Sequence, residues 1–224
     1  MAGKSAGKAT WIVAAGALVG IAAASARAAE VDAFLAGTAK SCVACDLSGR
    51  DLKARDFKRM KLDRVILKNA DLTEASLFRS TLQRADLSGA RLVDADLNRI
   101  DAKWADFHGA DMAGALLFEA DLSSANLAGV NLMNARLGQA RLNQANLEGA
   151  ILAGTDLRGA RLAGAKLAGA KVRSAKLDGQ KMREMDLRGT SFEGANLKNA
   201  ILTDAQTEGA NFDAAIMPDG KRQE

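Results

Sequence analysis

The sequence predicts an all-β fold in which the chain coils into a four-sided β-helix, and a five-residue period is the first reason. Every fifth residue from Leu47 to Met217 is apolar with two lapses, Ala102 and Thr207, and 25 of these 35 positions are leucine. Five residues turn an α-helix by about 500°, which would scatter the leucines. On a straight strand an odd period alternates faces. The leucines share one side only if the chain turns a corner within every pentad.

The other positions of the pentad place that corner. The residue two before the leucine is alanine in 23 pentads, and residues two apart on an extended segment share a face. The residue between them is mostly charged or an amide and points outward, so Asn126→Asp is expected to be nearly silent. The second residue after the leucine is glycine in 14 pentads and asparagine in three, and both tolerate positive φ. Four such corners close a coil of about 20 residues, and the 35 pentads make about nine coils.

Residues 1–28 are typical of a secretory signal peptide. Two lysines precede an apolar run over residues 11–24, and Ala26-Arg27-Ala28 is an A-x-A cleavage sequence. The run is shorter than the roughly 20 residues that a membrane-spanning helix needs. We therefore expect cleavage before Ala29 and a periplasmic or secreted mature chain without a membrane span. An uncleaved N-terminal anchor is the alternative.

The remaining segments are an N-terminal cap over 29–45, the repeat over 46–218 and a polar tail over 219–224. Residues 29–39 break the period and predict a short amphipathic helix that covers the open end of the solenoid. Inside the repeat, Arg50 and Arg55 stand at the small inward position, where an unpaired arginine would be costly to bury, so either these side chains escape under the cap or the coil there is distorted. Gln180 and Met185 mark a second irregular zone.

The pentad A-(D/N)-L-x-x resembles the pentapeptide-repeat family. It is seen in Ala85-Asp86-Leu87-Ser88-Gly89 and in Ala125-Asn126-Leu127-Ala128-Gly129, and the resemblance covers 46–218. It implies a right-handed quadrilateral β-helix. Some members of this family resemble B-DNA in shape and charge and protect DNA gyrase. The segment Asp46-Leu47-Ser48-Gly49 after the cysteines also resembles the lead-in of exported members.

Cys42 and Cys45 form a C-x-x-C motif at the start of the repeat. Two cysteines in an exported protein suggest a disulfide, and two buried thiols are the alternative. The resemblance to exported members favours a structural role for the pair. His108 is the single histidine, which leaves too few ligands for zinc, and Asp46 stands where haem attachment needs histidine. We expect neither a metal nor a cofactor.

Arranging the sequence in rows of twenty places outward side chains in columns. Three arginines share one corner column and two more share the next, while two phenylalanines lie on one face near Leu116, two coils apart. These residues are the candidate binding surface: Arg59, Arg79, Arg99, Arg64, Arg84, Phe78 and Phe118. Positive columns suit an acidic protein or an anionic envelope component, and grouped apolar residues suit a contact site. A plain solvated surface is the alternative.

The composition excludes several classes of function. Without residues 1–28 the chain carries 28 basic and 27 acidic residues, so it is near neutral and nucleic acid is an unlikely partner. We find no catalytic triad, P-loop or dinucleotide fingerprint, and the acidic residues follow the outward rows as solvated side chains. The sequence predicts an exported, non-catalytic scaffold, not an enzyme. The resemblance implies the alternative, a DNA-mimicking inhibitor or protector of DNA gyrase.

Overall fold

The computed structural model describes residues 28–182 and 185–224, which belong to two units, one ending at Ala39 and one beginning at Lys40. The predicted signal peptide lies outside the described residues except for Ala28. In the first unit a helix spans 28–35, as the sequence predicts for this segment. Gly37 ends it with φ of +76°, and Thr38 N–H donates to Ala33 O at 3.0 Å, as in a Schellman motif.

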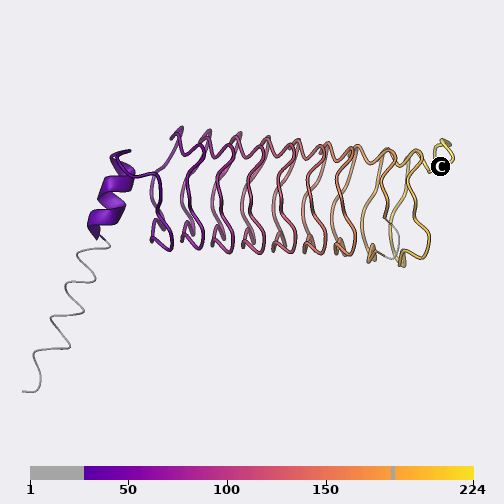
Figure 1. Cartoon of the computed structure of the whole chain (residues 1–224). Helices are drawn as coiled ribbons and strands as arrows, with labels where there is room; N and C mark the ends of the chain where they lie inside the picture. The colour runs from indigo at the N-terminus through magenta and orange to yellow at the C-terminus, as the bar shows by residue number, and fades with distance from the viewer. Residues whose placement is uncertain (1–27, 183–184) are drawn as a thin grey trace, which may run out of the picture. The chain divides into compact units, whose positions relative to one another are not determined.

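The second unit is a ladder of stacked coils with a repeat of 20 residues (Figure 1). Parallel bridges join residues 20 apart, from Ser41–Lys61 at one end to Asn196–Ile216 at the other. Each coil therefore pairs its backbone with the coils before and after it. The ladder includes Ser41, five residues before the predicted start of the repeat. At the far end, Ile216 bridges Arg222 in the antiparallel sense, so the polar tail folds back on the last coil.

The corners lie where the sequence places them. The residue three after each leucine donates its N–H to the leucine carbonyl, as Ala70 does to Leu67 at 3.0 Å, which closes a β-turn. The second residue after the leucine position has positive φ in the described pentads from Leu47 to Phe212, whereas in the last pentad, after Met217, the positive φ falls on Gly220. Twenty of these corner residues are not glycine, and their φ values run from 52° to 60°.

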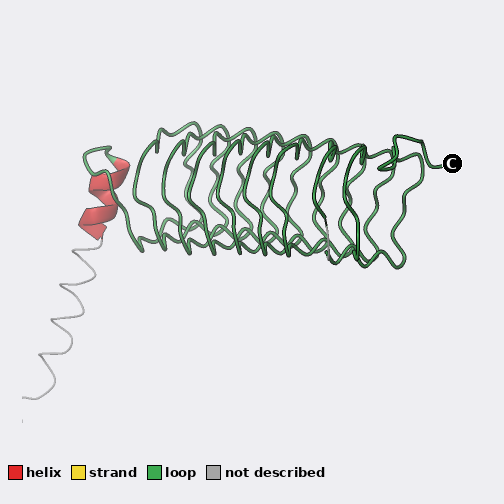
Figure 2. Cartoon of the chain, turned by 45° about the vertical axis from the view of Figure 1, so that its right-hand side comes forward, coloured by secondary structure: helices red, strands yellow, loops and turns green. Residues whose placement is uncertain are grey.

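The ladder contains bridges but no extended strands among the described residues (Figure 2). The predicted β-type pairing between coils is therefore present, but the pairing consists of single bridges and not of extended strands. A face holds so few residues between two corners that one central residue per face forms the bridge. The coil count and the capping role of the helix stay predictions.

A closed column of leucine and alanine fills the second unit. Leu127 and Ala125 are at most 1% exposed, and the same positions are buried from Met60 to Ala200 in the described part of the ladder, whereas in the last coil most of them are partly exposed. Polar residues at the small inward position follow one rule. The hydroxyls of Ser80, Thr155 and Thr190 donate to the carbonyl of the residue 23 earlier, at 2.6 to 2.9 Å. Because the partner is a backbone oxygen one coil away, these groups are buried without losing a hydrogen bond.

Of the residues predicted to mark irregular coils, Gln180 lies beside an interruption of the ladder, whereas Met185 is buried and its neighbour Asp186 keeps both of its bridges. Gln180 is 2% exposed, and its amide donates to Leu157 O at 2.5 Å. Beside it, the bridge that the register would place between Arg161 and Lys181 is not formed. By contrast, Arg50 and Arg55 are exposed and do not enter the column.

Candidate binding surface

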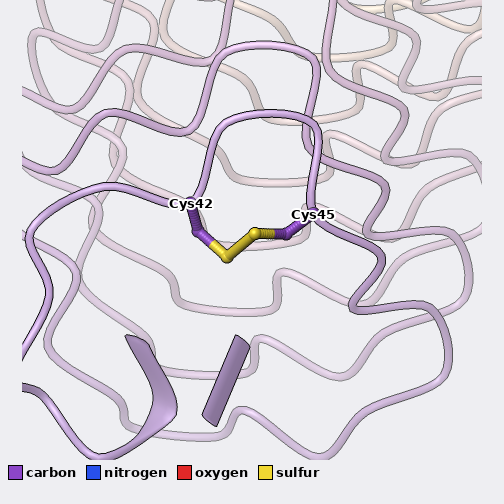
Figure 3. Close-up of a disulfide and its surroundings, with 2 residues drawn as sticks. All are labelled: Cys42 and Cys45. Atoms are coloured by element: carbon purple, nitrogen blue, oxygen red, sulfur yellow. A yellow bond between two sulfur atoms is a disulfide. The ribbon is translucent and has the colours of Figure 1, made fainter. Parts of the chain in front are cut away.

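Cys42 and Cys45 form a disulfide bond across the first corner of the second unit (Figure 3). Their Cα atoms lie 5.4 Å apart, and Ala44 between them has the positive φ of a corner residue. Both cysteines are buried, in the positions that leucine and alanine occupy at later corners. The pentad geometry brings these two positions together, so the disulfide forms without a departure from the fold. Of the two alternatives for this pair, the structure contains the disulfide.

The two phenylalanines of the candidate surface line one groove of about 640 Å³. Phe118 is 40% exposed and Phe78 is half-buried, and Leu116 lies in the same groove. The lining runs from Phe78 to Arg158 at intervals of 20 residues. The groove thus lies along one face over five coils, and large apolar side chains remain uncovered on it.

The corner arginines lie in columns 20 residues apart, and three of them contact an aromatic ring or a carboxylate. Arg79 packs over the Phe78 ring, with its Cζ 5.2 Å from the ring centre. Arg99 Nε lies 2.9 Å from Oε2 of Glu119, the next residue of the column. The second column has the same feature, since the Cζ of Arg84 lies 5.4 Å from the centre of the Trp104 ring. Of the five candidate arginines, Arg99 lines the groove.

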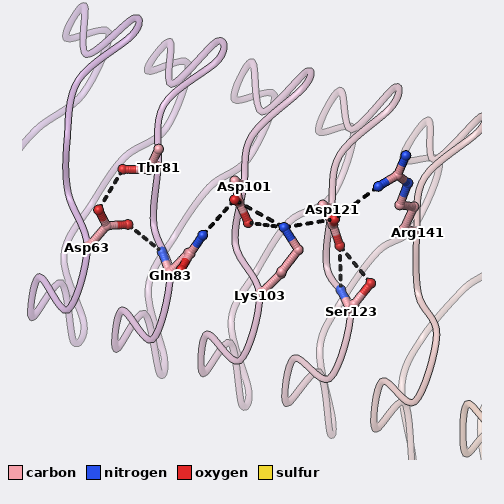
Figure 4. Close-up of polar contacts among 8 residues, drawn as sticks. All are labelled: Asp63, Thr81, Gln83, Asp101, Lys103, Asp121, Ser123 and Arg141. Atoms are coloured by element: carbon pink, nitrogen blue, oxygen red, sulfur yellow. Dashed lines mark hydrogen bonds and ion pairs between the residues drawn. The ribbon is translucent and has the colours of Figure 1, made fainter.

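A polar ladder runs along the neighbouring face (Figure 4), where the sequence predicts solvated residues. It joins eight residues over successive coils: Asp63, Thr81, Gln83, Asp101, Lys103, Asp121, Ser123 and Arg141. Gln83 Nε2 donates to Asp101 at 2.7 Å, and Lys103 Nζ lies 3.1 Å from Asp101 and 3.2 Å from Asp121. Lys103 therefore separates two carboxylates that occupy adjacent rungs.

Burial and hydrogen bonding compete at the centre of the polar ladder. Burial opposes the ionisation of Asp121, but hydrogen bonds from Ser123 and Lys103 outweigh it and hold the pKa of Asp121 below its ordinary value. Burial likewise opposes the charge of Lys103, and its hydrogen bonds to Asp101 and Asp121 raise its pKa. Both groups are thus charged near pH 7, and the pair stabilises the stacking of adjacent coils.

Sequence reasoning missed the polar ladder and part of the groove. Arg136, Gly138 and Arg158 also line the groove. The register of 20 contains the signal, because Phe78, Phe118, Gly138 and Arg158 fall in one column. The arginine columns predicted from the sequence occupy the second residue after the leucine, whereas Gly138 and Arg158 occupy the first and Arg136 precedes the leucine.

No group of three or more His, Cys, Asp or Glu side chains among the described residues is arranged to hold a metal ion. His108 is exposed, as its outward position predicts. None of the described helical segments has the length and apolar character that crossing a membrane requires.

These features define a solenoid built from five-residue repeats. The family model for pentapeptide repeats matches the chain in eight copies, over residues 80–117, 103–139, 140–179 and 181–217. The chain therefore belongs to the pentapeptide-repeat family, whose members form right-handed β-helices. No curated protein matches the chain.

Solved structures agree with this assignment. A trypsin-treated form of QnrB1, a plasmid-mediated fluoroquinolone resistance protein, superposes with a TM-score of 0.66 at 21% identity, covering 77% of this chain and 90% of that one. HetL from the cyanobacterium Nostoc sp. strain PCC 7120, a protein involved in heterocyst differentiation regulation, is 28% identical over 86% of this chain and 97% of its own, with a TM-score of 0.36. The similarity to QnrB1 shows a shared fold and nothing about shared activity.

Proposed function

We propose that this chain is an exported, non-catalytic β-solenoid that acts as a binding scaffold for a protein or for an anionic component of the cell envelope. The observation that carries the proposal is the groove on one face of the ladder, where Phe78, Leu116 and Phe118 stay uncovered. Uncovered apolar groups beside arginines are typical of contact sites. The ladder holds them rigidly, because every coil is bonded to its neighbours.

The Cys42–Cys45 disulfide supports the exported part of the proposal. Structural disulfides persist in oxidising compartments and are rare in the cytosol. Together with the signal-like segment at 1–28, the disulfide favours the periplasm or the extracellular space. The proposal also includes a solenoid of about nine coils, with residues 29–45 as its N-terminal cap.

Fractionation and crosslinking test this function together. We expect the full-length protein to reach the periplasmic or extracellular fraction with Ala29 as its new N-terminus, and to crosslink there to a discrete partner. A variant without residues 1–28 is the control and should stay in the cytoplasm. Cytoplasmic retention of the full chain would overturn export, and envelope fractions without a crosslinked partner would overturn the scaffold role.

DNA mimicry is the alternative that family membership raises. A DNA mimic needs sustained negative charge along its length, whereas Arg59, Arg79 and Arg99 occupy consecutive rungs of one corner column here. We therefore expect the purified full chain to leave DNA gyrase supercoiling unchanged. Inhibition of supercoiling at a stoichiometric ratio would favour the alternative.

A further inference from the structure

Gly138 opens a notch beside the exposed ring of Phe118. A Cβ at position 138 would lie 3.4 Å from Cδ2 of Phe118 and 3.8 Å from the carbonyl oxygen of Arg158, which is ordinary contact distance. The φ of Gly138 lies outside the left-handed region, unlike that of the corner glycines. The backbone therefore does not require glycine at this position. Glycine at position 138 leaves one side of the Phe118 ring uncovered, whereas a larger side chain there would cover it.

The groove contains one cation without a partner. Three arginines and one aspartate line it. Arg99 is paired with Glu119, and Arg158 donates to both carboxylate oxygens of Asp156, at 2.8 and 2.6 Å. Within the described part of the chain, the Arg136 side chain has neither an ion pair nor a hydrogen bond. A free guanidinium on a half-apolar surface attracts a carboxylate, which it can bind through two parallel hydrogen bonds.

Two primary amides complete the groove and favour a peptide over a lipid chain. The side chains of Asn98 and Gln139 line it. Asn98 Oδ1 accepts from Phe118 N–H at 2.8 Å, which holds this amide at the groove. Each primary amide offers donors as well as an acceptor, the combination that a peptide group also offers. An acyl chain offers no hydrogen-bond partner to the NH₂ groups of these amides and would displace the water that solvates them, at a cost in affinity.

We propose that this groove binds an extended acidic peptide segment of another protein, which places an apolar side chain over Gly138 against Phe118 and a carboxylate on Arg136. The proposal rests on the proposed scaffold function and assigns it a face and a partner chemistry. The volume of about 640 Å³ accommodates a few side chains of such a segment. The bound apolar group removes the Phe118 ring from water.

Selection from a random peptide display library on the oxidised full-length protein tests the partner chemistry. We expect the enriched peptides to combine an acidic residue with an aromatic or large aliphatic one. A synthetic, fluorescein-labelled form of the most enriched peptide then serves as the probe for fluorescence anisotropy. Enrichment of basic or uncharged sequences would overturn the proposal.

Two variants test the location. Gly138→Phe fills the notch, and Arg136→Glu reverses the free charge; each is expected to weaken probe binding at least tenfold. Ala128→Phe is the matched control, since Ala128 has the same place in its pentad on another face, and it should bind the probe as the wild type does. Far-UV circular dichroism confirms that each variant is folded. Wild-type affinity in folded Gly138→Phe, or equal loss in the control, would overturn the groove assignment.

Vesicles with anionic lipid and an anionic polysaccharide compete with the probe in separate measurements. Displacement by either, abolished by Gly138→Phe, would overturn the assignment to peptide. The envelope crosslinking experiment separates this proposal from the proposed function. If Gly138→Phe crosslinks to the same partner as the wild type, the scaffold function stands and the groove proposal fails. If the wild type crosslinks to nothing, the function fails too.

Discussion

Replacing Asn126 with aspartate tests the register of 20, because the same substitution at Asn146 meets different neighbours. Asn126 Nδ2 donates to Asp106 Oδ1 at 2.9 Å, and these two residues also bridge. Asn146 bridges Asn126 on one side and Lys166 on the other. Asn126→Asp therefore sets two carboxylates on adjacent rungs, whereas Asn146→Asp sets one carboxylate between an amide and an ammonium group. The sequence alone predicted a nearly silent change at Asn126, and this contact reverses that expectation.

The geometry sets the size of the effect. Asn126→Asp loses one side-chain hydrogen bond, worth about 1 kcal/mol. It also adds a repulsion of at least about 1 kcal/mol, the value for unit charges some 4 Å apart in bulk water, because Asn126 and Asp106 are half-buried and less well screened than in bulk water. We expect a loss of at least about 2 kcal/mol in unfolding free energy. Asn146→Asp keeps the acceptor for Glu148 N–H, at 3.1 Å, and should stay within about 0.5 kcal/mol of the wild type.

Urea denaturation followed by far-UV circular dichroism measures both variants at neutral pH. In low salt, Asn126→Asp should unfold at a clearly lower urea concentration than Asn146→Asp. In about 1 M salt the Debye length falls to about 3 Å, so roughly half of the difference should disappear. Equal unfolding midpoints in low salt, or a difference that salt leaves unchanged, would show that residues 20 apart are not neighbours.

Three further predictions follow from the same structure. Leu127 is fully buried, and its side chain contributes about 2 kcal/mol of apolar burial. Leu127→Asp would put a carboxylate without a partner in its place and should abolish cooperative thermal melting. An unchanged melt would show that the side chain lies outside the core. Joint replacement of Cys42 and Cys45 by alanine should lower stability by about 2 kcal/mol in urea, because the disulfide closes a short loop; an unchanged midpoint would contradict this role. Lys103→Met should destabilise by about 2 kcal/mol at pH 7, because Asp101 and Asp121 both keep their charge and lose the lysine between them, while Asp121 keeps Arg141 at 3.5 Å.

The pH dependence of Lys103→Met follows from the lowered pKa of Asp121. A carboxylate with a lowered folded pKa contributes stability above its unfolded pKa of about 3.8, and this stability is lost as the pH falls through the folded pKa. The deficit of the variant in urea should therefore shrink below about pH 4. A deficit of equal size at pH 3 and pH 7 would show that the ion pair does not cause it.

Much of the fold follows from the sequence because a strict period acts at every pentad. The five-residue spacing predicts the corners, and the leucine and alanine positions predict the core, including Leu127 and Ala125. The register of 20 also puts Phe78 and Phe118 on one face, which is the face that carries the groove. These predictions succeed because one geometric rule, repeated along the chain, decides which residues share a column.

The tertiary structure decided what happens within each column. Twenty corner residues other than glycine adopt positive φ, which costs roughly 1 kcal/mol each in isolation; the backbone bonds to the adjacent coils hold them there. The pairing of Arg99 with Glu119, the Asn126 bond to Asp106 and the Cys42–Cys45 disulfide also became visible only with atoms in place. A period brings side chains near one another, whereas their length, rotamer and burial decide which atoms bond.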